Sequence, residues 1–281
     1  MAHILNGKKL SIERAEKLKE TVSLLPTQPT LVIIQIGDVA ESNIYIQGKT
    51  KMAEKIGARV QREKYSANIS EKEIIKDIEK FNQDKSVHGI IIQLPIPESL
   101  DKNSIIDVID PNKDVDGLTA QNIKQLCINN TGIIPATTKG ILTLCKENNI
   151  VLQGKHIAIM GRSTLVGKPT MLACVNENAT VTLCHSYTKD LEKITQSADI
   201  IITATGTRNL ITKNHVRTGQ IIIDVGIHAI EEENRKVSGD VSYDEVAEIV
   251  ESITPVPGGV GPMTVISLFE NLVDAYKKHA L

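Results

Sequence analysis

The chain has 281 residues, of which 41% are hydrophobic, and a formal net charge of −2. This length suits two domains or one large α/β domain. A charge so close to zero excludes a protein that binds nucleic acid or a membrane surface through a large basic excess, and a chain with no Trp and two Phe offers little aromatic surface for stacking bases.

The N-terminal segment "MAHILNGKKLSIERAEKLKE" is amphipathic and carries acidic residues. It lacks the apolar run of a signal peptide, and no later stretch approaches the ~20 apolar residues of a membrane span. The cysteines at positions 127, 145, 174 and 184 show neither C-x-x-C spacing nor a zinc-ligand pattern. We therefore expect a cytoplasmic protein with reduced thiols, no bound metal and no membrane partner.

Short apolar runs bounded by turn residues alternate with segments of helical spacing in the first half of the chain. Because these runs are almost continuously apolar, they predict a parallel sheet whose two faces are covered by helices. One helix begins with Ser70, followed three residues later by Glu73, which is the pattern of a capping box. The predicted strands are 30–37, 58–65 and 89–95, and the predicted helices are 42–57 and 70–83.

A second series of strands follows an irregular join at residues 111–140. We expect two α/β domains, of which the second is a Rossmann-like doubly wound parallel sheet. The last predicted helix, 265–280, returns to the first domain. The predicted strands of the second series are 155–161, 179–184, 199–206 and 220–226, and the predicted domains are 1–120 with 264–281, and 121–263.

The strand "HIAIM" runs directly into "GRSTLVGKPTMLACV", in which Gly161 and Gly167 flank a turn and Pro169 suits a first helical turn. Such a turn directs backbone amides and the positive end of a helix at a phosphate group. The generic G-x-G-x-x-G pattern is absent, so a tight turn without a ligand is the alternative. Two later strands end in Gly206 and Gly226, which favours a ligand at the carboxyl ends of the strands.

The end of the second strand in this series indicates the cofactor type. An NAD site usually has an Asp or Glu there, bound to the ribose diol, whereas this strand ends in "LCHSYT" and has no carboxylate. Arg162 in the turn and Ser186 after the strand would instead suit a 2′-phosphate group. We therefore predict NADP rather than NAD, with a solvated surface charge as the alternative for Arg162.

Polar side chains also stand out in the first half. Tyr45 and Lys49 are four residues apart in a predicted helix, so they share a face. Gln93 interrupts an apolar strand, where a buried amide needs hydrogen-bond partners. "KDVDGLT" supplies Asp114 and Asp116 near the same sheet edge. The alternatives are a solvated Lys49 and an Asp116 that caps an Asp-Gly turn.

Residues 255–264, "PVPGGVGPMT", contain three prolines and three glycines. No ordinary helix or central strand tolerates this density, because proline lacks an amide donor and glycine loses the most backbone entropy on folding. This segment is either a sharp turn between elements or a rigid surface on which a ligand lies close to the main chain.

Taken in order, "YIQGK", "GIIIQLPIP", "PNKDVDGLT", "GRSTLVGKP", "DVGI", "GDV" and "TPVPGGVGPMT" make the whole chain resemble the methylenetetrahydrofolate dehydrogenase/cyclohydrolase family. The resemblance implies two α/β domains that flank a cleft, with both activities in that cleft, NADP as cofactor, and a homodimer formed through the cofactor domains. It implies two reactions without a metal. In the first, 5,10-methylenetetrahydrofolate is oxidised to the 5,10-methenyl cation, which is then hydrolysed to 10-formyltetrahydrofolate.

By the same resemblance, Lys49 is the acid/base of hydrolysis, Gln93 orients it, Asp116 holds the pterin, and Tyr45 stacks on the folate. A lysine beside a cationic carbon in a partly closed cleft has a lowered pKa, and an amide partner adds no countercharge that would raise it. The residues implied for the cofactor are Gly161, Arg162, Ser163, Val166, Gly167, Ser186, Thr205, Gly206 and Ile227. Those implied for the tetrahydrofolate substrate are Tyr45, Lys49, Gln93, Leu94, Asp116, Pro257, Gly258 and Gly259.

Four positions depart from the family pattern. Ala136 and Thr138 in "PATTKG" replace a common Cys and Pro, which puts the packing near the nicotinamide in question. Glu41 stands where a small residue is usual, and Gly48 loosens its helix by ~1 kcal/mol relative to alanine or makes room for a ligand. Competing interpretations are an enzyme with one of the two activities, an NADP dehydrogenase for a shikimate-like or amino-acid substrate, and a non-catalytic folate- or nucleotide-binding protein.

Overall fold

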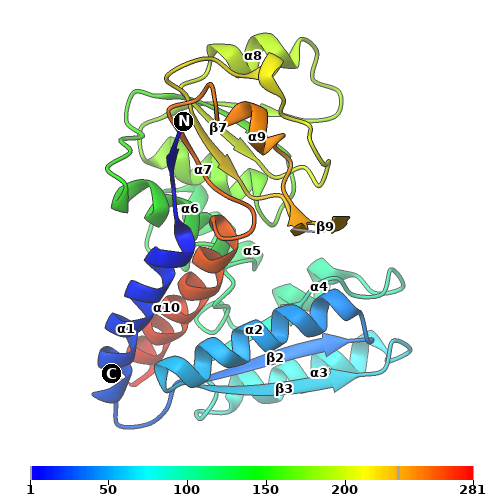
Figure 1. Cartoon of the computed structure of the whole chain (residues 1–281). Helices are drawn as coiled ribbons and strands as arrows, with labels where there is room; N and C mark the ends of the chain where they lie inside the picture. Colours follow the sequence, from blue (N-terminus) through cyan, green and yellow to red (C-terminus); the bar gives the residue numbers. More distant parts are fainter. Residues whose placement is uncertain (1, 233–234, 281) are drawn as a thin grey trace. The chain divides into compact units, whose positions relative to one another are not determined.

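The computed structural model describes residues 2–232 and 235–280, and the chain divides into two compact units. We call them the three-stranded unit, Ile12–Ala136 with Val265–Leu281, and the six-stranded unit, Met1–Ser11 with Thr137–Thr264. Each is an α/β unit built on a parallel sheet, as the sequence predicts (Figure 1). The units change at residues 11/12, 136/137 and 264/265, whereas the predicted boundaries are 120/121 and 263/264.

The sheet of the three-stranded unit has the order β3-β2-β4. Every residue of β2 and β4 is buried, because helices cover both faces. The strands β2 (Thr30–Ile36), β3 (Arg59–Tyr65) and β4 (Gly89–Gln93) confirm the three predicted strands to within two residues at each end. The helices are α1 (Gly7–Ser23), α2 (Ala40–Ile56), α3 (Glu71–Gln83), α4 (Lys102–Asp107) and α5 (Ala120–Cys127).

Helices α2 and α3 lie on opposite faces of this sheet. Ile74 of α3 belongs to a buried cluster with Ile34 of β2. Neighbouring strand residues point to opposite faces, so Gln35 and its register partner Gln93 face the other side. There the Nε2 of Gln35 donates to the Oδ1 of Asn43 on α2 at 3.2 Å. The alternation of β2 and β4 therefore directs two buried amides toward α2.

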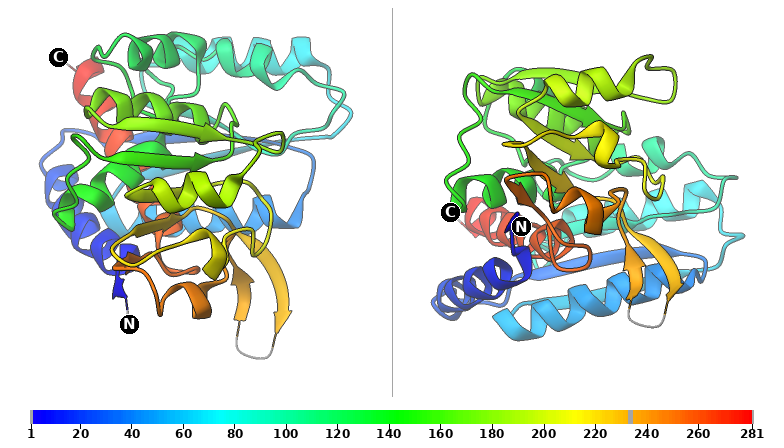
Figure 2. Two further views of the ribbon diagram at one scale, coloured as in Figure 1. Left: turned by 90° about the horizontal axis from the view of Figure 1, so that it is seen from above. Right: turned by 45° about the horizontal axis from the view of Figure 1, so that its top comes forward.

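The sheet of the six-stranded unit is parallel throughout, in the order β1-β11-β8-β7-β5-β6. Its four longer strands confirm the second predicted series, and Figure 2 shows them with their covering helices. They are β5 (His156–Met160), β6 (Thr180–Cys184), β7 (Ile200–Thr203) and β8 (Ile221–Asp224). The other elements are α6 (Ala136–Glu147), α7 (Gly167–Asn176), α8 (Leu191–Ser197), the short 3-10 helix Lys213–His215 and α9 (Tyr243–Val246).

Several elements were not predicted. Two-residue strands β1 (His3–Ile4) and β11 (Ser252–Ile253) extend the six-stranded sheet, and β9 (His228–Glu232) pairs with β10 (Arg235–Ser238) as an antiparallel hairpin. The expectation of an irregular segment over 111–140 was wrong, because α5 and the first turn of α6 lie within it. The side chain of Thr119 caps α5 by accepting a hydrogen bond from the amide of Asn122.

Helix α10 (Val260–Ala280) begins inside the Gly/Pro segment. The prediction that no helix occurs there was therefore wrong for its last five residues. Pro262 is the third residue of the helix, and the first turn of a helix needs no intrahelical amide donor there. Residues 255–259 remain a loop, as predicted.

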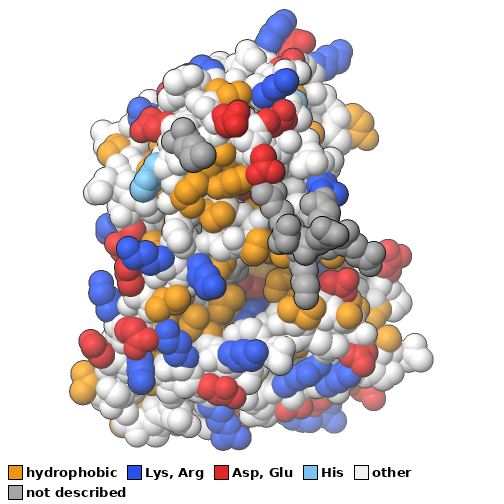
Figure 3. All heavy atoms as spheres, in the orientation of Figure 1, with side chains coloured by type: hydrophobic (Ala, Val, Ile, Leu, Met, Phe, Trp, Pro, Cys, Tyr) orange, Lys and Arg blue, Asp and Glu red, His pale blue; other side chains and the backbone are white. Residues whose placement is uncertain are grey.

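None of the helices formed by the described residues is long and apolar enough to cross a membrane. Cys145, Cys174 and Cys184 are buried and Cys127 is exposed, and all four are free thiols, as predicted. Basic and acidic side chains are interspersed on the face shown in Figure 3, in line with a net charge of −2.

Candidate active site

Helix α2 and strand β4 bring Lys49 and Gln93 into contact in the three-stranded unit. The Nζ of Lys49 donates to the Oε1 of Gln93 at 2.9 Å, and Gln93 is 7% exposed. The Nε2 of Gln93 donates to the carbonyl of Leu94 at 2.8 Å. Because the amide nitrogen is held there, the amide oxygen faces the lysine. The interpretation of Lys49 as a fully solvated side chain is therefore excluded.

Burial lowers the pKa of the Lys49 amine, and the negative charge of Asp116 opposes this shift. Burial also raises the pKa of the Asp116 carboxyl, which the charge of Lys49 partly offsets. Both shifts have the sign that desolvation gives to a charged group. The two residues interact through space, and the amine itself is hydrogen-bonded to an uncharged amide.

In the "KDVDG" segment, the side chains of Lys113 and Asp114 form hydrogen bonds with the surrounding chain, whereas that of Asp116 forms none with the described residues. The Nζ of Lys113 donates to the carbonyls of Phe81 and Asp84. Asp114 accepts from the amides of Gly117 and Thr119 and from the Nδ2 of Asn122. Within residues 2–232 and 235–280, no hydrogen-bond donor contacts the carboxylate of Asp116. Asp114, and not Asp116, therefore caps the Asp-Gly turn.

Tyr45 lies one turn before Lys49 on α2, with 43% of its surface exposed. Burial of its hydroxyl, followed by the charge of Glu41, raises the pKa of this phenol. Leu94 is half-buried beside Gln93, and its carbonyl also accepts from the Oγ of Ser42 at 3.4 Å. The departure at Glu41 therefore acts on Tyr45 electrostatically.

In the six-stranded unit, the residues predicted for the cofactor come directly after the carboxyl ends of neighbouring parallel strands. Met160 is in register with Cys184 on β6 and with Thr203 on β7, which is in register with Asp224 on β8. β6 and β7 lie on opposite sides of β5, so β5 is where the strand order reverses. The predicted residues Arg162, Ser186, Thr205, Gly206 and Ile227 each lie two or three residues beyond one of these strand ends.

The turn between β5 and α7 is close-packed. Gly161 has φ +109°, and a Cβ on Gly167 would collide with the carbonyl oxygen of Gly161. The Oγ of Ser163 accepts from the amides of Val166 at 3.1 Å and Gly167 at 3.4 Å. Both glycines are thus required by the turn itself, and Ser163 supplies the hydrogen bonds that hold the start of α7.

Sequence reasoning missed Tyr187. Its ring is 79% exposed and its centroid lies 5.8 Å from the Cζ of the exposed Arg162, which makes a cation–π pair. The available signal was an aromatic residue at a strand end in an aromatic-poor chain. The guanidinium group of Arg162 therefore lies close to Tyr187, which directly follows Ser186 in the sequence.

The glycines of the loop over 255–259 are explained by backbone conformation and contacts within the six-stranded unit. Gly258 has φ +109°, and a Cβ on Gly259 would lie 2.6 Å from the carbonyl oxygen of Pro255. The carbonyl of Gly258 accepts from the amide of Lys8 at 2.8 Å. The first turn of α10, which follows this loop, approaches the predicted cofactor residue Ile227, since a Cβ on Gly261 would lie 3.9 Å from its Cδ1.

The departures at Ala136 and Thr138 are accommodated without strain. Ala136 is the buried first residue of α6. The Oγ of Thr138 is 3.1 Å from the Oγ of Thr170 on α7, so both buried hydroxyls are satisfied. Thr138 therefore ties α6 to the helix that follows the predicted phosphate turn.

Two models of one protein family match most of the chain. Residues 5–116 match the family model "Tetrahydrofolate dehydrogenase/cyclohydrolase, catalytic domain", and residues 135–280 match the model of the NAD(P)-binding domain of the same family. The "Bifunctional protein FolD" of Agathobacter rectalis is 43% identical over 99% of this chain and 100% of its own length.

Two solved structures are similar over the whole chain. The bifunctional methylenetetrahydrofolate dehydrogenase/cyclohydrolase of Campylobacter jejuni has a TM-score of 0.96 at 39% identity, over 99% of both chains. The dehydrogenase-cyclohydrolase of Trypanosoma brucei, solved in complex with NADP cofactor and an inhibitor, has a TM-score of 0.95 at 30% identity, over 99% of this chain and 98% of that one.

Proposed function

This chain belongs to the tetrahydrofolate dehydrogenase/cyclohydrolase family, and on that premise we propose that it catalyses two successive reactions of one-carbon folates. The first is the NADP-dependent oxidation of 5,10-methylenetetrahydrofolate to 5,10-methenyltetrahydrofolate. The second is the hydrolysis of that product to 10-formyltetrahydrofolate. The observation that carries the proposal is the Lys49 amine, whose pKa is lowered by burial and whose partner is the uncharged Gln93.

For hydrolysis, Lys49 acts as the acid/base. A neutral amine can accept a proton from the water that adds to the cationic methenyl carbon, and the resulting ammonium can return it when the ring opens. Gln93 holds the amine without a countercharge. A carboxylate in its place would stabilise the ammonium form and weaken the base.

For substrate binding, Asp116 offers carboxylate oxygens that no donor of the described chain contacts, and these suit the paired N–H donors of a pterin edge. The exposed ring of Tyr45 suits stacking on the aromatic part of folate. Leu94, Pro257, Gly258 and Gly259 complete the proposed contacts. We assign Tyr45, Lys49, Gln93, Leu94 and Asp116 as folate contacts to the three-stranded unit, and the cofactor contacts to the six-stranded unit, which also carries Pro257, Gly258 and Gly259.

The six-stranded unit fits NADP better than NAD. At the end of β6 the chain reads Cys184-His185-Ser186, without the carboxylate that usually binds the ribose of NAD. Arg162 and Ser186 are exposed and suit a 2′-phosphate. Gly206 has open space around its Cα, which allows close approach to the main chain. When bound, NADP supplies the oxidant for the one-carbon group of the substrate.

A single assay tests the bifunctional proposal. The purified protein with 5,10-methylenetetrahydrofolate and NADP should show the methenyl absorbance rise and then decay faster than in enzyme-free buffer. A rise without accelerated decay would leave the enzyme with the dehydrogenase activity only. The absence of both would contradict the proposal.

The proposal extends to a homodimer in the cytoplasm. The family resemblance places the dimer contact in the cofactor domain, which corresponds here to the six-stranded unit. Sedimentation equilibrium at micromolar concentration should give about twice the 30.7 kDa mass of the chain. A concentration-independent monomer would contradict this part of the proposal alone.

A further inference from the structure

Asp240 is a fully buried carboxylate that hydrogen-bonds to the chain segment after β7. Its Oδ2 accepts from the Oγ of Thr203 at 2.9 Å. It also accepts from the amide of Thr205 at 2.7 Å and from the hydroxyl of Thr205 at 2.9 Å. Thr205 is one of the residues proposed to bind the cofactor, and this oxygen accepts two hydrogen bonds from it and one from Thr203 at the end of β7, which fixes the start of that loop.

The other oxygen of Asp240 reaches the segment after β8. Its Oδ1 lies 2.7 Å from the Nε2 of His228, whose side chain is 17% exposed. His228 directly follows Ile227, which is another of the residues proposed to bind the cofactor. One carboxylate therefore links two loops that are far apart in the sequence.

These loops need such a link because the hydrogen bonds between neighbouring strands of the sheet end before them. The amide of Ala204 donates to the carbonyl of Met160, and the amide of Val225 donates to the carbonyl of Thr203. Thr205 and Ile227 lie beyond these bonds, and the next paired residue, His228 of β9, belongs to the separate two-stranded sheet β10-β9. The Asp240 carboxylate takes over that task with charge-assisted hydrogen bonds, which are stronger than those between neutral groups.

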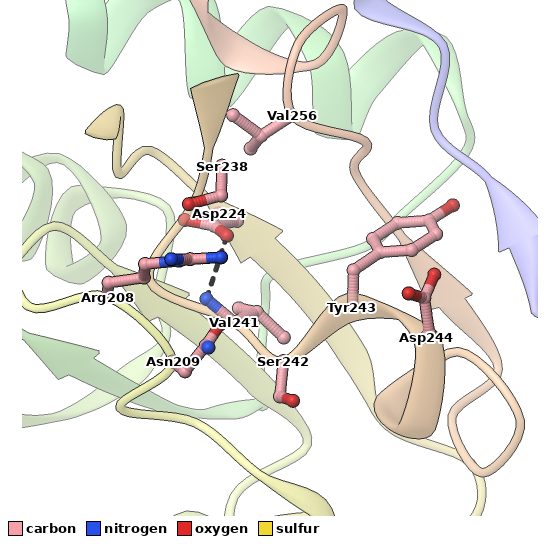
Figure 4. Close-up of a pocket in the computed structure, with 10 residues that line it drawn as sticks. Arg208, Asn209, Asp224, Ser238, Val241, Ser242, Tyr243, Asp244 and Val256 are labelled. Atoms are coloured by element: carbon pink, nitrogen blue, oxygen red, sulfur yellow. Dashed lines mark hydrogen bonds between the residues drawn. The ribbon is translucent and has the colours of Figure 1, made fainter. Parts of the chain in front are cut away.

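A second buried carboxylate holds Asp240 in place. Asp224 accepts from the amides of Gly226, Asp240 and Val241 at 2.9, 3.1 and 3.0 Å. It also lines a cavity of about 160 Å³, in which its bond from Val241 is drawn in Figure 4. Burial raises the pKa of Asp224 to about 6. A Cβ on Gly226 would collide with Asp240, and one on Gly239 with Asp224, so the approach of these groups depends on both glycines.

We propose that Asp240 is a positioning residue for the dehydrogenase reaction, because its carboxylate holds Thr205 directly and Ile227 through His228 against the cofactor. This inference rests on the proposed function. It goes beyond it by giving a specific task to a fully buried group that is not among the residues proposed to bind substrate or cofactor. Hydrolysis needs Lys49 and Gln93, which lie in the other unit, so the two activities should respond differently to loss of this network.

The test uses variants that each remove one arm of the network. Thr205→Val removes a hydroxyl at nearly constant volume, and His228→Ala removes the bond to Oδ1. We expect each to raise the KM for NADP and lower the kcat of the dehydrogenase, about tenfold in kcat/KM, the size of one charge-assisted hydrogen bond. In His228→Ala, hydrolysis of methenyltetrahydrofolate supplied directly should stay within about twofold of the unsubstituted enzyme, since His228 is not among the residues proposed to bind substrate or cofactor. His228→Gln, whose amide can also donate to Asp240, should recover most of the lost rate.

Gln220→Ala provides a matched control. Gln220 is fully buried in the same unit, and its Nε2 donates to the carbonyls of Thr195 and Ala198 at 2.7 Å. It directly precedes β8 at the amino end of that strand, whereas the residues proposed for the cofactor follow the carboxyl ends. This variant should lower the thermal unfolding midpoint as much as His228→Ala does, with both activities retained in the protein that stays folded.

Two results would overturn the inference. In one, His228→Ala and Thr205→Val reduce both activities equally, as a general loss of folded protein would. In the other, they lower the unfolding midpoint and leave the kinetics of NADP unchanged. A failure of the proposed function is recognised separately, because the unsubstituted enzyme would then lack one or both activities.

Discussion

At the scale of single residues, the amine of Lys49 is the group that we propose as the acid/base of the hydrolytic step. It lies 2.9 Å from an uncharged amide oxygen, and burial lowers its pKa. Lys49→Met keeps the length of the side chain and removes the base. We expect hydrolysis to fall by at least about 10²-fold, the usual size of acid–base catalysis, and hydride transfer to fall much less.

Lys51→Met is the matched control for that variant, because Lys51 is an exposed residue on the same helix. It should leave both rates close to those of the unsubstituted enzyme. Equal loss of both activities in Lys49→Met, with folate affinity intact, would remove Lys49 from the hydrolytic role.

The pH dependence of hydrolysis should report the same amine. A base works in its neutral form, so the rate should rise as pH passes upward through the pKa of Lys49. Burial places that pKa below the ~10.4 of an ordinary lysine. Gln93→Glu puts a carboxylate on the amine, raises its pKa and should move the rise to higher pH.

These profiles require subtraction of the uncatalysed hydrolysis at each pH. Gln47→Glu is the control, since Gln47 is exposed on α2 and two residues from Lys49. An inflection that Gln93→Glu fails to move would mean that the rate reports another group.

Arg162 should discriminate between the two nicotinamide cofactors. A guanidinium that binds the 2′-phosphate contributes nothing to NAD, so Arg162→Ala should raise the KM for NADP at least about tenfold and that for NAD little. Tyr187→Ala should raise the KM for NADP by about fivefold or less, because an exposed cation–π contact contributes ~0.5–1 kcal/mol.

Tyr187→Phe keeps the ring and should behave like the unsubstituted enzyme. Lys189→Ala removes an exposed charge near the same strand end and controls for general electrostatic attraction. Identical KM changes for NADP and NAD in Arg162→Ala would exclude Arg162 from the 2′-phosphate site.

At the scale of secondary-structure elements, Gly48 is a weak point of α2. It is exposed in the helix interior, and a Cβ added there would meet no atom within 4 Å. Gly48→Ala should therefore raise the free energy of unfolding by ~1 kcal/mol. Thermal unfolding measures that gain. A higher folate KM in the same variant would show that the bare position also serves the ligand.

The elements that the sequence predicted share a local cause. The strands β2, β4, β5 and β7 are apolar runs, and α3 carries its own capping box at Ser70. Such signals lie within a few residues of the element that they specify. β1 carries no comparable signal, because its two residues form a strand only by pairing with β11, about 250 positions later in the sequence.

At the scale of the whole molecule, the three-stranded unit is incomplete without the end of the chain. The Nδ2 of Asn271 on α10 donates to the carbonyls of Val115 and Ile134 at 2.9 and 3.0 Å. Phe269 and Leu272 are fully buried. Deletion of residues 265–281 should therefore unfold this unit and abolish hydrolysis.

Hydrogen exchange with peptide resolution measures that outcome. Strands β2 and β4 should lose protection in the truncated chain, while β5 and β7 of the six-stranded unit keep more of theirs. Equal protection of β2 in the full-length and truncated chains would show that residues 12–136 fold without α10.

The sequence alone predicted the two α/β units, the strand ends that carry the residues proposed for the cofactor, and the candidates Lys49, Gln93 and Asp116. Apolar periodicity, turn chemistry and short motifs act over a few residues, so they can be read locally. Only the tertiary structure distinguished the support role of Asp114 from the available carboxylate of Asp116.

Tertiary structure alone likewise indicated the role of Asp240, which the sequence shows only as part of the "GDV" motif and whose partners lie between 12 and 37 positions away in the sequence. The roles proposed for Asp240 and Tyr187 depend on contacts that the chain makes only when folded. The sequence does not distinguish a solvated carboxylate from one that hydrogen-bonds to two loops, because burial and hydrogen-bond partners are properties of the fold.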